Sequence, residues 1–199
     1  MAKLFYTAIT SLDGYIADAE GNFDWSMPDS EVHSFINDLE RGIRTQLMGR
    51  KLYEVMTFWE PLYGQKDLPP FIEDYATIWH DAEKIVYSRT LREAGSKRTR
   101  IESTFDPLAV ERMKTEATAD LSVGGAELAG QALKSGLVDE IHFFVSPVVV
   151  GGGKRALPHD IRLNLALLGQ RAFPNGVAHL HYQVLKGDPD SGPVAESDA

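Results

Sequence analysis

Three segments of the sequence join a short apolar run to a glycine or hydroxyl residues and then to a predicted helix or turn. The first, Leu47–Tyr53, carries Gly49 followed by the bases Arg50 and Lys51. The unpaired N–H groups and the dipole at a helix N-terminus attract anions, and two cationic side chains strengthen that attraction. The segment predicts a phosphate site, and a strand–helix turn with solvated bases is the alternative.

The second segment is Val86–Thr90, in which an apolar run ends on Ser88, Arg89 and Thr90. A guanidinium between two hydroxyls suits a phosphate monoester such as the 2′-phosphate of a cofactor. Taken alone, the same residues are also compatible with a surface turn.

The third segment, Leu121–Leu128, runs through Gly124 and Gly125 into a predicted helix. Two glycines allow a ligand to approach the backbone closely, although a tight turn would use them equally well. In an open α/β sheet, ligands bind beyond the carboxyl ends of the strands, where such junctions gather. Together the three segments predict one extended ligand that carries phosphate.

Other motifs in the chain are less favourable. Residues 151–156 match the pattern G-x-G-x-x-A, but Pro158 follows where a Rossmann motif would open a helix. His179 and His181 share one face of a predicted strand and could form a metal-binding pair. No third ligand is near them in the sequence, so we expect exposed or core-edge histidines and no metal site.

The pattern of apolar residues predicts alternating strands and helices, followed by antiparallel strands. The predicted strands are Lys3–Thr10, Gln46–Gly49, Lys84–Ser88, Thr99–Glu102, Asp120–Val123, Ile141–Val150, Arg162–Ala172 and Val177–Leu185. The predicted helices run from Pro28 to about Arg44 and over Arg50–Phe58, Phe71–Asp81, Pro107–Ala117 and Ala126–Ser135. Asn175–Gly176 between the last two strands is a strong hairpin signal. The order favours an α/β fold with a mostly parallel sheet and an antiparallel edge.

The composition excludes several classes of protein. The 199 residues have a net charge of −9, which disfavours nucleic acid as a partner, and contain no cysteine, which excludes thiol chemistry and disulfides. No signal peptide or membrane span is expected, and we expect a cytoplasmic protein. One domain over residues 1–186 is expected, followed by an acidic, disordered tail over 187–199.

Taken together, the motifs resemble the dihydrofolate reductase-like superfamily. They are most similar to stand-alone proteins like the C-terminal reductase domain of the bifunctional riboflavin-biosynthesis deaminase–reductase. The matching segments follow the family order over roughly residues 3–186 and are Ser11–Ala17, Leu47–Tyr53, Ser88–Thr90, Val123–Leu128 and Ser146–Gly152. The resemblance implies a dihydrofolate reductase-like three-layer fold with an antiparallel C-terminal hairpin at the sheet edge.

The resemblance also implies NADPH as the cofactor. The three junctions would bind, in turn, its pyrophosphate with part of the 2′-phosphate, its adenosine end and its middle, and Ala8 with the loop at Ile16 would face the nicotinamide. The implied cofactor-binding residues are Ala8, Ile16, Gly49, Arg50, Lys51, Leu52, Ser88, Arg89, Thr90, Gly124, Gly125, Ala126, Glu127 and Leu128.

Two departures from the family pattern concern the substrate. Riboflavin reductases usually carry a lysine where this chain has Tyr15, and a glutamate where it has Val123. The Trp-x-x-Pro-x-Asp pattern of folate reductases resembles residues 25–31, but its acid position falls on Ser30. Asp29 and Glu31 lie on either side of that position.

The expected function is therefore NADPH-dependent reduction of a small planar heterocycle, with Asp29 and Glu31 as candidate catalytic proton suppliers. Tyr15, Trp25 and Phe35 are candidates for the aromatic wall of the substrate site, and core packing is the alternative for the last two. Two other functions stay open: 5-amino-6-(5-phosphoribosylamino)uracil reductase and a non-catalytic nucleotide-binding protein. The resemblance also makes a homodimer an expectation.

Overall fold

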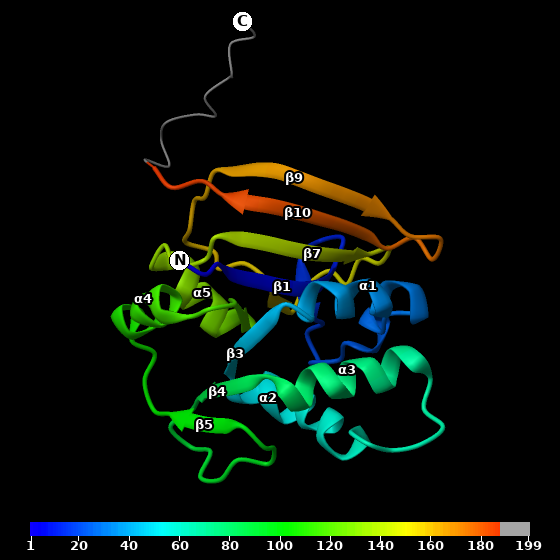
Figure 1. Ribbon diagram of the computed structural model, residues 1–199. Coiled ribbons are helices and arrows are strands. Elements are labelled where there is room, and N and C mark those ends of the chain that lie inside the picture. The colour runs from blue at the N-terminus through cyan, green and yellow to red at the C-terminus, as the bar shows by residue number, and fades with distance from the viewer. Residues whose placement is uncertain (188–199) are drawn as a thin grey trace, which may run out of the picture.

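The centre of the molecule is an eight-stranded sheet (Figure 1). The computed structural model describes residues 1–187, so positions 188–199 of the predicted tail lie outside the described part. From one edge to the other, the strands are β5 (Thr99–Glu102), β4 (Glu83–Tyr87), β3 (Ile43–Gly49), β6 (Asp120–Gly124), β1 (Leu4–Ser11), β7 (Glu140–Ser146), β10 (Ala178–Val184) and β9 (Leu165–Ala172).

The first six strands in this order run parallel, and β10 is antiparallel to both of its neighbours. The turn between β9 and β10 contains Gly176, which has a φ of +88° and donates its N–H to the carbonyl of Phe173 at 2.9 Å. The predicted parallel sheet with an antiparallel C-terminal hairpin is confirmed.

Helices cover both faces of the sheet. They are α1 (Ser30–Glu40), α2 (Arg50–Met56), α3 (Pro70–Asp81), α4 (Pro107–Glu116) and α5 (Ala126–Lys134), with short 3-10 helices η1 (Asp24–Ser26) and η2 (Thr57–Leu62). Leu47 and Met48 are consecutive in β3 and therefore point to opposite faces. Leu47 is in the core cluster with residues of α4 and α5, and Met48 is in another with residues of α2 and α3. The result is the expected three-layer arrangement.

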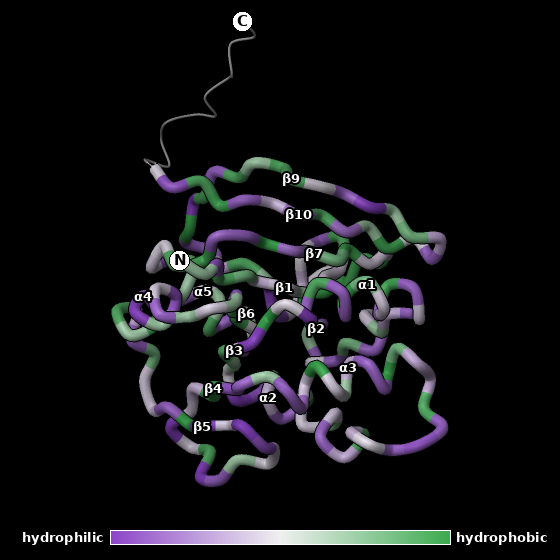
Figure 2. Tube along the Cα trace, viewed as in Figure 1, coloured by the Kyte–Doolittle hydropathy of each residue, from purple (hydrophilic) through white to green (hydrophobic). Residues whose placement is uncertain are grey.

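Hydrophobic residues gather along the central strands, whereas β5 at the sheet edge is mainly hydrophilic (Figure 2). Among the described helices, none is long and apolar enough to cross a membrane. The predicted strand Ile141–Val150 ends at Ser146, because Pro147 has no N–H to continue the ladder.

Two segments far apart in sequence are joined beside the carboxyl end of β1. A two-stranded sheet pairs β2 (Tyr15–Ala17) with β8 (Lys154–Arg155), neither of which the sequence patterns predicted. The carboxylate of Asp13 accepts hydrogen bonds from the N–H groups of Val150 at 3.2 Å and Gly151 at 2.8 Å. Gly153, with a φ of +126°, passes so close to the carbonyl of Ala17 that a Cβ would clash there. Asp13 therefore connects the two segments that the family pattern contains as separate motifs.

Glu40 is a buried carboxyl at the end of α1, with only 7% of its surface exposed. Nε2 of Gln46 donates a hydrogen bond to Oε2 of Glu40 at 3.5 Å. Burial raises the pKa of Glu40 to about 7, and hydrogen bonds from Gln46 and Thr7 oppose that rise only in part. The folded protein therefore holds a proton on Glu40 at a pH where the unfolded chain has released it.

Because the pKa of Glu40 is raised in the folded protein, we expect the free energy of unfolding to fall as the pH rises. Below the ordinary value of 4.5, Glu40 is protonated in both states; between 4.5 and about 7 only the unfolded chain ionises, which favours unfolding. The accumulated loss in the free energy of unfolding is about 3 kcal/mol. Glu40→Gln should remove this loss, so urea unfolding should find the variant more stable than the wild type at pH 8 and close to it at pH 4.5.

The control is Glu111→Gln, which changes an exposed glutamate of α4. Parallel pH dependence of stability in the wild type and in Glu40→Gln would contradict the assignment of the raised pKa to this carboxyl.

Candidate functional site

A cleft of about 480 Å³ lies at the carboxyl ends of β3, β4, β5 and β6. All three sequence junctions contribute to it. The lining residues are Gly49, Arg50, Lys51, Leu52, Tyr87, Ser88, Arg89, Thr90, Ser103, Thr104, Phe105, Gly125, Glu127, Leu128, Gln131 and Lys154. Ten of the residues proposed to bind the cofactor therefore lie around one space.

The backbones of the first and third junctions approach each other through glycine. Gly125 has a φ of +85°, and a Cβ on it would lie 3.6 Å from Cβ of Leu52 and 3.7 Å from the backbone nitrogen of Gly49. A Cβ on Gly124 would clash with the Leu52 side chain. A side chain at Gly125 would thus occupy the space in front of the Gly49 backbone, which a ligand needs for close approach.

Cationic side chains give the cleft a positive field. Arg50 is paired with Glu54 at 2.8 Å, and Lys154 is paired with Glu127 at 2.7 Å. The hydrogen bond and charge of Lys154 lower the pKa of Glu127, which favours its ionised form. Within residues 1–187, Lys51 and Arg89 form no ion pair, so their charges are available to an anion.

The second junction is a hydroxyl-stabilised turn. The Oγ atom of Ser88 accepts hydrogen bonds from the N–H groups of Thr90 at 3.2 Å and Leu91 at 2.9 Å. The side chain that follows Ser88, Arg89, lines the cleft. The surface-turn interpretation and the phosphate-binding interpretation are therefore compatible at this position.

Sequence reasoning missed several cleft residues. Tyr87 and Phe105 pack edge to face with 5.4 Å between ring centroids, and Phe105 follows Ser103 and Thr104 in the loop after β5. The predicted strand Thr99–Glu102 pointed to this loop, because its carboxyl end lies at the same sheet edge. Lys154 reaches the cleft through the β2–β8 pairing, for which no local sequence signal exists.

Four of the predicted cofactor residues do not line the cleft, and one of them is Gly124, the last residue of β6. Ala8 is partly buried and packs against the core, and Ile16 lies in β2. Ala126 lines a neighbouring pocket of about 560 Å³, which shares Glu127 and Lys154 with the cleft.

A smaller pocket of about 200 Å³ lies next to β1 and β7. Its lining residues are Ile9, Trp25, Ser26, Met27, Pro28, Val32, Ser146, Pro147, Asn175 and Val177. The indole Nε1 of Trp25 is buried and has no hydrogen-bond partner in the described structure. A buried N–H without a partner is costly, and no protein group in the described structure offsets that cost here.

The two predicted catalytic carboxylates have other partners. Asp29 is the N-cap of α1, and its Oδ1 accepts the N–H of Val32 at 2.9 Å. Glu31 is exposed and binds the guanidinium of Arg171 at 2.8 Å. Neither lines the smaller pocket, although Asp29 directly follows the lining residue Pro28. Their role as proton suppliers stays a prediction.

The structure separates the three aromatic candidates. Trp25 lines the smaller pocket, whereas Phe35 packs against Phe144 and Phe173 at centroid distances of 6.0 and 5.6 Å. The guanidinium carbon of Arg155 lies over the ring of Tyr15, 5.1 Å from the centroid of that ring. Thus, of the three, only Trp25 is brought to that pocket.

A protein-family model described as the RibD C-terminal domain matches residues 2–179. The uncharacterized protein YyaP of Bacillus subtilis strain 168 is 30% identical over 185 residues, which cover 90% of this chain and 94% of YyaP. Both matches extend over all three glycine and hydroxyl junctions.

Solved structures have the same fold. A protein named for riboflavin biosynthesis from Shewanella sp. PV-4 superposes with a TM-score of 0.71 at 22% identity, covering 94% of this chain and all of that one. A deaminase/5-amino-6-(5-phosphoribosylamino)uracil reductase of Thermotoga maritima gives a TM-score of 0.62 at 13% identity, covering 92% of this chain and 57% of that one. The family model spans most of the chain and its fold agrees with these structures, so the protein belongs to the RibD C-terminal domain family.

Proposed function

We propose that this protein is an NADPH-dependent reductase of a small planar heterocycle. The observation that carries the proposal is the order of the two pockets along one sheet edge. The cationic cleft spans β5, β4, β3 and β6, and the smaller pocket lies at β1 and β7, the next two strands. An extended nucleotide in the cleft would therefore direct its far end toward the smaller pocket.

The cleft suits the nucleotide in its chemistry. The charges of Lys51 and Arg89 favour phosphate, and the hydroxyl of Ser88 can donate while its oxygen stabilises the turn. Tyr87 and Phe105 provide an apolar wall for a base. NADPH, when bound, supplies the hydride, and the protein contributes position and the exclusion of water.

The smaller pocket supports a compact, unphosphorylated substrate. Its volume of about 200 Å³ lies below the roughly 300–1,000 Å³ of pockets for larger ligands. The indole of Trp25 lines this pocket and offers an aromatic surface for stacking of a planar ring. At the two positions where the resemblance supplies polar groups, Val123 is buried in the core and Tyr15 contacts Arg155.

A second candidate is reduction of 5-amino-6-(5-phosphoribosylamino)uracil. The name of the Thermotoga maritima neighbour favours it. A third, binding of nucleotide without catalysis, predicts cofactor affinity with no turnover of any substrate. The homodimer and the cytoplasmic location also stay predictions.

We expect NADPH to bind more tightly than NADH. A charge-assisted contact between the 2′-phosphate and the bases of the cleft, with Arg89 foremost, is worth about 1.5–3 kcal/mol, or roughly 10- to 150-fold in Kd. Isothermal titration calorimetry measures both constants. Arg89→Gln should reduce the ratio of the Kd for NADH to the Kd for NADPH. Arg92→Gln, which changes an exposed base in the same loop, should leave that ratio unchanged. Equal Kd values for the two nucleotides in the wild type would exclude the 2′-phosphate assignment.

Gly125→Val should abolish NADPH binding, because the new side chain would lie in front of the Gly49 backbone. The matched control is Gly136→Val. Gly136 also has a positive φ, +66°, but a Cβ there meets no atom within 4 Å and is remote from the cleft. Both variants carry comparable backbone strain. Fluorescence titration with NADPH should separate them, and equal loss of binding in both would show that strain alone explains the effect.

The substrate prediction is turnover of a flat, unphosphorylated ring and weak or no turnover of the aminouracil phosphate. We expect Asp29→Asn to lower kcat/KM with dihydrofolate more than Glu31→Gln does, because Asp29 adjoins the pocket and Arg171 holds Glu31 away from it. Asparagine preserves the cap of α1, so the loss would report on chemistry. Steady-state oxidation of NADPH measures turnover of dihydrofolate and of the aminouracil phosphate. Efficient turnover of the aminouracil phosphate by the wild type and both variants would favour the aminouracil reductase instead.

A further inference from the structure

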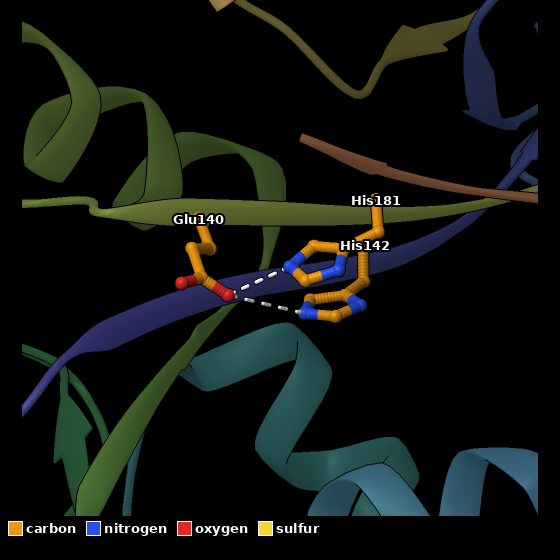
Figure 3. A group of neighbouring side chains, drawn as sticks. All are labelled: Glu140, His142 and His181. Carbon is orange, nitrogen blue, oxygen red and sulfur yellow. Dashed lines mark hydrogen bonds and ion pairs between the residues drawn. The ribbon is translucent and has the colours of Figure 1, made fainter. Parts of the chain in front are cut away.

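Strands β7 and β10 bring two histidines and a carboxylate together on one face of the sheet (Figure 3). Glu140 and His142 are two residues apart in β7, so their side chains share a face. His181 of β10 lies directly opposite His142 in the antiparallel register. His179 and His181 thus lie next to residues of β7, which is almost 40 positions earlier in the chain.

The ligand atoms of the three residues converge. Oε2 of Glu140 lies 2.6 Å from Nε2 of His181 and 4.0 Å from Nε2 of His142, and one ligand atom from each residue lies within 4.8 Å of the others. A cation bonded at about 2 Å to each atom needs them roughly 3 Å apart. Shifts of less than about 1 Å would therefore suffice to coordinate it.

We infer that Glu140, His142 and His181 form a binding site for a divalent transition-metal cation, Zn²⁺ foremost. Imidazole nitrogen suits Zn²⁺, and two histidines with one glutamate are a known ligand set that leaves a coordination position for water. Mg²⁺ prefers oxygen ligands in octahedral geometry, so it fits this set poorly.

Neighbouring side chains hold each buried ligand through its other polar atom. Nζ of Lys3 donates to Oε1 of Glu140 at 2.5 Å, which leaves Oε2 facing the two imidazoles. Nδ1 of His142 lies 3.1 Å from Nε2 of His179, which fixes the ring with its own Nε2 toward Glu140. Metal sites characteristically contain such outer partners, which orient the ligands.

The cluster is accessible from solvent. His181 has 24% of its side chain exposed, which gives a cation a route to the three ligand atoms. None of the three residues lines the cleft or the smaller pocket, so the site would join β7 to β10 independently of the proposed reduction.

Calorimetric titration of the full chain with Zn²⁺ tests the site. We expect one equivalent to bind to the wild type, and His181→Gln and Glu140→Gln each to weaken that affinity at least tenfold. His159→Gln, which removes a histidine outside the cluster, should leave it unchanged. Excess Mg²⁺ should not displace the bound Zn²⁺. Equal affinities of His181→Gln and His159→Gln, or no saturable binding to the wild type, would overturn the inference.

A second measurement needs no variant. Co²⁺ added to the wild-type chain should give visible ligand-field absorption with one-equivalent saturation, and Zn²⁺ should abolish it by displacement. Co²⁺ that shows only the weak absorption of the hydrated ion would overturn the site, whatever the folding of the variants.

Discussion

The arrangement of the molecule depends on the parallel pairing of six strands. Parallel strands all end at the same edge, so every connection from a strand into a helix or turn begins there. Gly49, Ser88 and Gly125 are far apart in the chain, yet they line one cleft because β3, β4 and β6 are neighbours. Since backbone N–H groups, glycines and bases follow the strand ends, this edge is the place where a phosphate-bearing ligand can be bound by the main chain.

The sequence was sufficient to predict those parts of the site whose signal lies within a few consecutive residues. A strand running into Gly49-Arg50-Lys51, or into Gly124-Gly125, predicts a junction whatever lies around it, and the parallel rule then brings the junctions together. The residues that escaped prediction depend on distant partners. Lys154 reaches the cleft only because β8 pairs with β2, and Arg171, the unpredicted partner of Glu31, lies 140 positions away from it.

The histidines illustrate the same limit. His179 and His181 showed only that two imidazoles share a strand face, and nothing nearby in the sequence offered a third ligand. The register of β10 against β7 brings Glu140 and His142 to that face. Phe35 is another example, because the sequence did not show that this partly buried ring packs against Phe144 and Phe173. Side-chain surroundings of this kind are properties of packing rather than of pattern.

The contact of Asp13 with Val150 and Gly151 has a consequence for how such chains diverge. The carboxylate of Asp13 holds two loops at a fixed separation through its hydrogen bonds to Val150 and Gly151. Gly153 allows the same two segments to approach closely at Ala17. An insertion in either loop would carry Asp13 out of reach of its two N–H groups unless the other loop changed length to match. Related chains should therefore vary these loops in concert, and a chimera that exchanges only one of them should lose the alignment of both.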